Sequence, residues 1–133
     1  MIEKLVDAFI ANRENMLKRL RIAHPESYDA LIYAIVETLK TDEWDSPDSD
    51  SITVARTEDY SRRYYYIIGA NDCETIYFLS VEYGTCSGCD ELCFIEDQSE
   101  VNERGEYDPP TDKQVEQYFD LCLVIVKNIK RID

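Results

Sequence analysis

Three consecutive strand-like segments in the middle of the chain constrain its fold more than any other feature. The stretches SITVAR (51–56), RRYYYIIGA (62–70) and ETIYFLSVEYG (74–84) are rich in β-branched and aromatic residues, and the first and third alternate in polarity. GAND at 69–72 predicts a hairpin turn, because Gly69 and Asn71 tolerate left-handed backbone angles. We therefore expect a three-stranded antiparallel meander.

Helical periodicity flanks these strands on both sides. Apolar residues recur at three- and four-residue steps over 2–22 and 26–40, and HPES at 24–27 separates the two stretches. The short break predicts a helical hairpin. A last helix begins after a cap at Thr111 or Asp112 and carries Lys127, Lys130 and Arg131 at its C-terminal end. The order predicts a single α+β domain over residues 1–133, with the C-terminal helix packed on the sheet.

Both faces of the predicted sheet are partly apolar. Tyr77, Leu79 and Val81 share one face of the third strand, whereas Ile76 and Phe78 lie on the other. Two interpretations stay open for the second face. It is buried within the chain, or it is a surface for self-association as a homodimer.

The charge balance limits the classes of partner. The formal net charge is −14 and the pI is near 4.4, so the surface repels nucleic acid and anionic membranes and attracts basic proteins. No apolar run approaches the ~20 residues of a membrane span, and charges are spread through the N-terminal segment, unlike in a signal peptide. The sequence predicts a cytoplasmic protein.

Acidic residues gather in two predicted loops, each with an aromatic residue. The stretch 42–50 contains five acids and no base, and the stretch 90–108 contains eight acids and one arginine. Such loops would present carboxylates, in place of phosphates, to a basic groove, with the aromatic residues as anchors. The plain alternative is that these acids only keep the protein soluble. The predicted partner-binding residues are Asp42, Glu43, Trp44, Asp45, Asp48, Asp50, Glu96, Asp97, Glu100, Glu103, Glu106, Tyr107 and Asp108. We expect the first loop to fold back and dock the Trp44 ring.

The segment GTCSGCDELC holds three of the five cysteines. A C-x-x-C turn brings two sulfurs close enough for one metal or one disulfide. Cys86, Cys89 and Cys93 supply three ligands for zinc, and Cys73 or Cys122 would have to supply the fourth. A thiol-redox site and simple burial of the thiols are the competing interpretations.

The stretch YGTCSGCD at 83–90 resembles a segment of small phage and mobile-element proteins, in which a strand ends in Y-G-[ST]-C-S-G-C-D. This resemblance covers eight residues and implies a viral or mobile-element origin, with no assigned chemistry.

No catalytic set stands out elsewhere. His24 is the only histidine, and its place at a helix junction predicts a capping or solvent-facing role. There is no phosphate-binding glycine motif. We therefore expect a non-enzymatic acidic interaction protein without a cofactor, which inhibits a basic host nucleic-acid-binding protein such as a CRISPR or restriction nuclease. The alternative is a zinc-binding or thiol-redox domain that uses the cysteine segment. An enzyme that uses carboxylates and metal ranks last.

Overall fold

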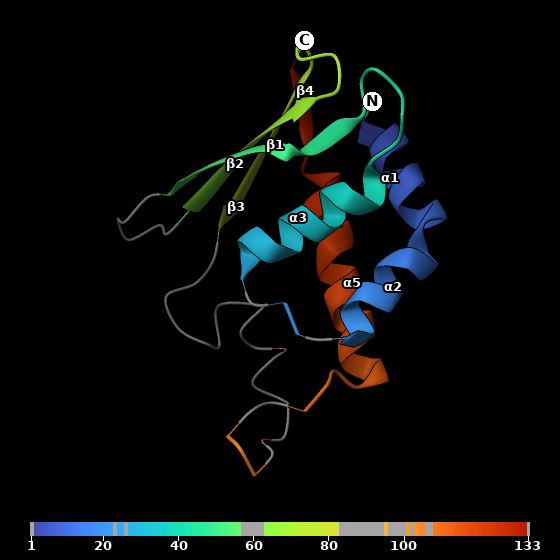
Figure 1. Ribbon diagram of the computed structural model, residues 1–133, viewed down its shortest axis with the longest axis vertical. Coiled ribbons are helices and arrows are strands. Elements are labelled where there is room, and N and C mark those ends of the chain that lie inside the picture. The colour runs from blue at the N-terminus through green and yellow to red at the C-terminus, as the bar shows by residue number, and fades with distance from the viewer. Residues whose placement is uncertain are drawn as a thin grey trace.

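The helices pack on one face of an antiparallel sheet in a computed structural model of the chain (Figure 1). The structure describes residues 2–22, 24–25, 27–56, 63–82, 95, 101, 103–105 and 108–132. The helices are α1 (Ile2–Ala11), α2 (Arg13–Ile22), α3 (Tyr28–Leu39) and α5 (Asp112–Lys127). The strands are β1 (Pro47–Arg56), β2 (Arg63–Ala70), β3 (Ile76–Glu82) and β4 (Lys130–Ile132), in the order β1-β2-β3-β4.

The α+β class and the helical hairpin are confirmed, but the expected number of strands is wrong. Residues 130–132 do not extend the last helix. They form β4, which pairs with the start of β3, so the sheet has four strands. The helix ends at Lys127 because Asn128 closes its last turn, with its backbone N–H on the carbonyls of Ile125 and Val126.

The first predicted helix is also divided. At Asn12, between α1 and α2, the side chain donates to the carbonyl of Ala8 at 2.8 Å and so competes for the backbone groups of the turn. The start of α5 follows the prediction. Thr111 accepts from the backbone of Gln114, and the Gln114 side chain accepts in return from Thr111, which is a capping box.

The predicted alternation of the strands is confirmed by burial. Tyr66 and Ile68 of β2 and Tyr77 and Leu79 of β3 are buried under the helices, whereas Ile67 is 45% exposed on the opposite face. The core therefore lies between the inner face of the sheet and the helices. Phe9 of α1 stacks on Phe119 of α5 within it, with ring centres 5.1 Å apart.

The hairpin between β2 and β3 differs from the sequence prediction in one respect. The residue with a left-handed backbone is Cys73, with φ 62°, and not Gly69 or Asn71. Gly69 serves close packing instead, because a Cβ atom there would lie 3.0 Å from the Cβ of Ser51. Ser51 lies in the irregular part of β1, between its pairings at Pro47 and Ile52.

Candidate functional site

The segment 41–46 connects α3 to β1 and is organised by its own hydroxyl groups. The backbone N–H of Thr41 donates to Oγ of Ser46 at 2.8 Å, and the N–H of Glu43 donates to Oγ1 of Thr41 at 3.2 Å. The N–H of Ser46 reaches back to the carbonyl of Glu43 at 3.2 Å. Short serine and threonine side chains favour such local bonds over a regular ladder, which explains why the chain turns here. We call residues 41–46 the acidic loop.

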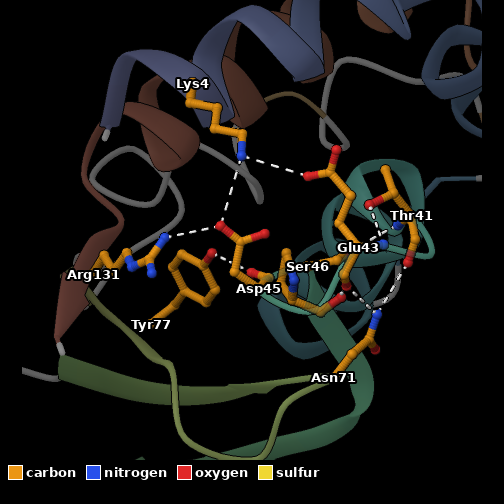
Figure 2. A network of polar contacts seen from close by, with 9 residues as sticks. Lys4, Thr41, Glu43, Asp45, Ser46, Asn71, Tyr77 and Arg131 are labelled. Carbon is orange, nitrogen blue, oxygen red and sulfur yellow. Dashed lines mark hydrogen bonds and ion pairs between the residues drawn. The ribbon is translucent and has the colours of Figure 1, made fainter.

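The turn between β2 and β3 holds the acidic loop from outside (Figure 2). Nδ2 of Asn71 donates to the carbonyls of Thr41 and Glu43 at 3.1 and 2.8 Å, and its backbone N–H donates to the carbonyl of Ser46 at 3.0 Å. The N–H of Asp72 donates to the carbonyl of Trp44 at 2.7 Å. Four carbonyls of the loop are thus engaged by the turn, so the loop has a defined conformation.

The turn itself is stabilised by the carboxylate of Asp72. This carboxylate accepts from the backbone N–H groups of Glu74 and Thr75, both at 2.9 Å. The bond from Thr75 is the main reason why the pKa of Asp72 lies below its usual value.

Asp45 points inward from the acidic loop and is nearly buried. Its Oδ2 lies 3.0 Å from Nη1 of Arg131 in β4 and 3.6 Å from Nζ of Lys4 in α1. Its carbonyl accepts from the hydroxyl of Tyr77 in β3 at 2.5 Å. The side chains of Asp45 and Arg131 are each 12% exposed, so this ion pair is largely shielded from water (Figure 2). Asp45 thus ties the loop to the sheet and α1, and its carboxylate is not part of an exposed acidic surface.

Trp44, unlike Asp45, is exposed to solvent. Its side chain is 64% exposed, so the expectation that the loop docks this ring is wrong. The loop does fold back, but its backbone makes the contacts, and the guanidinium of Arg131 lies 5.8 Å from the centre of the ring. Asp42 and Glu43 are exposed beside it, and Glu43 lies 3.5 Å from Lys4.

A small hollow of about 60 Å³ lies beside the loop. Its lining is mostly apolar and includes two acids and two bases. Organic ligands and cofactors usually occupy some 300–1,000 Å³, so the hollow is too small for them. The apolar part of the lining comes from Leu5, Ala8, Leu39, Pro47 and Tyr77, and the polar part comes from Lys4, Thr41, Glu43, Asp45, Ser46 and Arg131.

The remaining acids of the first stretch lie on β1. The carboxylate of Asp48 accepts from the N–H of Asp50 at 3.1 Å and from the hydroxyl of Ser51 at 3.2 Å, and Nζ of Lys40 lies 3.8 Å away. Asp50 is exposed. The exposed acids of this stretch are therefore Asp42, Glu43 and Asp50.

The second acidic stretch lies far from the first where the structure describes it. Its exposed members are Glu103 and Asp108, and Asp108 precedes α5. The acidic loop contacts Arg131, beyond the other end of α5, and 16 helical residues span about 24 Å. These parts of the two stretches do not form one surface. Glu96, Asp97, Glu100, Glu106 and Tyr107 lie outside the described residues.

His24 has a structural role at the end of the molecule that contains Asp108. Its Nδ1 lies 2.6 Å from the hydroxyl of Tyr118, and its Nε2 lies 2.8 Å from the carbonyl of Asp108. The histidine therefore links the helix junction to α5 and to the segment before it, which goes beyond the expected capping role.

The cysteine segment, with Cys86, Cys89 and Cys93, also lies outside the described residues. Of the two proposed fourth ligands, Cys73 is exposed at the hairpin and Cys122 is fully buried in α5. Burial raises the pKa of the Cys122 thiol far above its usual value, which keeps it neutral. Within the described parts of the chain, no group of three or more acidic, histidine or cysteine side chains is arranged to hold a metal ion.

Sequence reasoning missed the basic and polar partners of the acidic loop, namely Lys4, Asn71, Tyr77 and Arg131. No local pattern singles them out, because they are brought to the loop from α1, the hairpin, β3 and β4.

Comparison with protein-family models, with curated proteins and with solved structures finds no match for this chain. Among the residues that the structure describes, none of the helices has the length and apolar character needed to cross a membrane.

Proposed function

We propose that the protein is an interaction module that presents Trp44 and its acidic neighbours to a basic partner protein. The observation that carries this proposal is the 64% exposure of Trp44 on a loop that is held by four hydrogen bonds to its carbonyls. A large aromatic side chain exposed on an ordered loop is costly to solvate and is the residue type most enriched among binding hot spots.

The order of the loop favours binding. A partner does not have to freeze the backbone of residues 41–46, because Asn71 and Asp72 already hold it. Pre-organisation of this kind reduces the entropy lost on association. The hollow next to the loop offers a recess for one side chain of the partner.

Charge supports a basic partner. Asp42 and Glu43 are exposed next to Trp44 in the loop, Asp50 is exposed in β1, and the chain as a whole carries −14. Such a field speeds the encounter with a basic surface and disfavours direct contact with nucleic acid.

The exposed carboxylates favour one class of basic partner. We assign it to the basic nucleic-acid-binding proteins, for which exposed carboxylates replace phosphates. The resemblance of residues 83–90 to phage and mobile-element proteins favours a host defence nuclease, CRISPR or restriction, as the target of such a decoy. The protein would then act as an inhibitor.

Affinity capture at graded salt tests the proposal. The immobilised full chain is compared with Trp44→Ala and with Asp42→Asn/Glu43→Gln, and Tyr33→Ala is the matched control, because Tyr33 is 45% exposed on α3. We expect a basic protein that the wild type and the control retain, and that both loop variants bind at least tenfold more weakly. Retention should fall as salt rises to 1 M.

The decoy mechanism has its own measurement. A labelled duplex bound to the captured partner should be displaced by the wild type and not by Trp44→Ala. Equal capture at low and at 1 M salt contradicts the electrostatic argument, and wild-type binding by Trp44→Ala contradicts the assignment of the loop. A partner that binds the protein and the duplex together contradicts the decoy mechanism alone.

A further inference from the structure

The hollow beside the acidic loop lies between elements that are far apart in the chain. Its apolar lining includes Leu5 and Ala8 of α1, Leu39 of α3 and Pro47 of β1. Leu39 and Pro47 are buried, whereas Leu5 and Ala8 are only half-buried. Part of the apolar surface of α1 is therefore still in contact with water, and its coverage by a partner would favour binding.

The charged groups of this lining are already paired with one another (Figure 2). Nζ of Lys4 lies 3.5 Å from Oε2 of Glu43 and 3.6 Å from Oδ2 of Asp45. The same oxygen of Asp45 lies 3.0 Å from Nη1 of Arg131. Two bases thus balance two acids. A charged side chain that enters the hollow would lose its water and would have to compete with these ion pairs for a counter-ion.

The uncharged polar groups of the lining are bonded as well. Oγ1 of Thr41 accepts from the N–H of Glu43, and Oγ of Ser46 accepts from the N–H of Thr41. The hydroxyl of Tyr77 donates to the carbonyl of Asp45. Every polar side chain that the structure describes in the lining therefore has a partner within the protein. The lining favours an occupant without polar atoms, because a polar one would have to displace these bonds.

The size of the hollow limits the occupant further. Its volume is about 60 Å³. A water molecule needs roughly 10–15 Å³, and an apolar cavity of about 150 Å³ holds benzene. The hollow is thus too small for an aromatic ring but has room for several carbon atoms, as in the branched end of a leucine, isoleucine or valine side chain.

We infer that the hollow receives one branched aliphatic side chain of the basic partner. This inference rests on the proposed function and adds to it the kind of side chain that the partner carries among its basic residues. Arg131 joins the two parts of the surface, because it lines the hollow and its guanidinium lies 5.8 Å from the centre of the exposed Trp44 ring. The partner would contact Trp44, fill the hollow and face the exposed Asp42 with a base.

Three small molecules with the same branched four-carbon skeleton test the hollow on the full-length protein. Isobutanol is neutral, isobutylammonium is a cation and isobutyrate is an anion. The methyl NMR signals of Leu5, Ala8 and Leu39 report binding in millimolar titrations. We expect isobutanol to shift these signals and not those of Ile22, which is 78% exposed on α2. The two ions should bind at least about tenfold more weakly.

A matched pair of variants connects the hollow with the partner. Ala8→Leu adds three carbon atoms to the lining and leaves the charges and Trp44 in place, whereas Ala11→Leu adds the same atoms at an exposed position of α1. Ala8→Leu should bind isobutanol and the captured basic partner at least about tenfold more weakly, and Ala11→Leu should bind both as the wild type does. The ratio between Ala8→Leu and the wild type should not change with salt, because the lost contact is apolar.

The inference is overturned if isobutanol does not shift these signals, if either ion binds as well as isobutanol, or if Ala8→Leu retains the partner as the wild type does. In each case a loss of binding in Trp44→Ala still supports the proposed function. A wild type that retains no basic partner overturns both. A dimer in sedimentation that Ala8→Leu abolishes assigns the hollow to a second copy and overturns the inference. The comparison of the three small molecules needs no variant, so it decides the inference even if Ala8→Leu does not fold.

Discussion

Oδ2 of Asp45 lies 3.0 Å from Nη1 of Arg131, although 86 residues separate the two in the chain. Each side chain is only 12% exposed, so each charged group has its partner nearby where a solvent-exposed group would have water. This contact joins the acidic loop to the last strand. It also places the Arg131 guanidinium 5.8 Å from the centre of the Trp44 ring. One buried ion pair therefore supports both the fold and the proposed binding surface.

Removal of Asp45 should strongly destabilise the protein. Asp45→Ala leaves the guanidinium of Arg131 in a largely buried place without its carboxylate, and we expect a loss of about 3 kcal/mol in the free energy of unfolding. Lys4→Ala removes a cation that is 62% exposed and should cost less than about 1 kcal/mol. Urea denaturation measures both.

A double-mutant cycle checks that the effect belongs to the pair. Asp45→Ala/Arg131→Ala should be less destabilised than the sum of the single variants, with a coupling of about 1–3 kcal/mol. If the losses in unfolding free energy of the two single variants simply add, Asp45 and Arg131 do not stabilise the protein through their contact.

Gly69 should not tolerate a side chain. Its added Cβ would lie 3.0 Å from the Cβ of Ser51, so Ser51 would have to move by a few tenths of an ångström, and that atom is attached directly to the backbone of β1. We expect Gly69→Ala to cost about 1–2 kcal/mol. Ser51→Gly has its own cost, because it removes the bond to Asp48, but in thermal and urea unfolding it should cost less in the Gly69→Ala chain than in the wild type. If Ser51→Gly costs the same in both chains, close packing is not the reason for this glycine.

The contact between Glu37 and Ser49 should make stability depend on acid pH. The hydroxyl of Ser49 donates to Oε1 of Glu37, and this bond, followed by one from Tyr33, holds the pKa of Glu37 below its usual value. A carboxyl with a lowered folded pKa contributes stability that is fully present above its unfolded pKa, near 4.5, and is lost as the pH falls through the folded pKa.

The variant Glu37→Gln isolates this contribution. It should be less stable than the wild type at pH 7, and the difference should shrink as the pH is lowered from about 5 to 3. Unfolding curves across this range give the difference directly. A gap that stays constant with pH would mean that the charge of Glu37 does not contribute to stability.

The two cysteines that the structure describes should differ in reactivity. Cys73 is exposed, whereas Cys122 is fully buried and its thiol pKa is raised by desolvation. In a chain with Cys86, Cys89 and Cys93 replaced by serine, a thiol reagent should modify one cysteine in the native protein and two after denaturation. Fast native labelling of both would contradict the burial of Cys122.

Zinc binding by the cysteine segment would make the stability of the protein depend on the metal. If Cys86, Cys89 and Cys93 hold zinc, purified protein contains one equivalent of the metal, and a chelator lowers its melting temperature. Elemental analysis and thermal melts decide the question. Metal-free protein with an unchanged melt rules the zinc hypothesis out.

The sequence by itself determined those features that depend on neighbouring residues. Alternation in β2 and β3 separated the buried Tyr66 and Ile68 from the exposed Ile67, because a strand points successive side chains to opposite faces. The Thr111 cap of α5 could likewise be predicted from the sequence, because its hydrogen bonds join residues only three positions apart. The acidity of residues 42–50 was equally plain.

Only the tertiary structure decided what each residue of that stretch does. Asp45 turns inward because Arg131, Lys4 and Tyr77 meet it from three other elements, and Trp44 is left exposed because the hairpin holds the loop by its backbone. The fourth strand follows the same rule, since residues 130–132 become β4 through pairing with β3. Ion pairs and strand ladders between distant residues form only when whole elements pack together, and no local spacing encodes them.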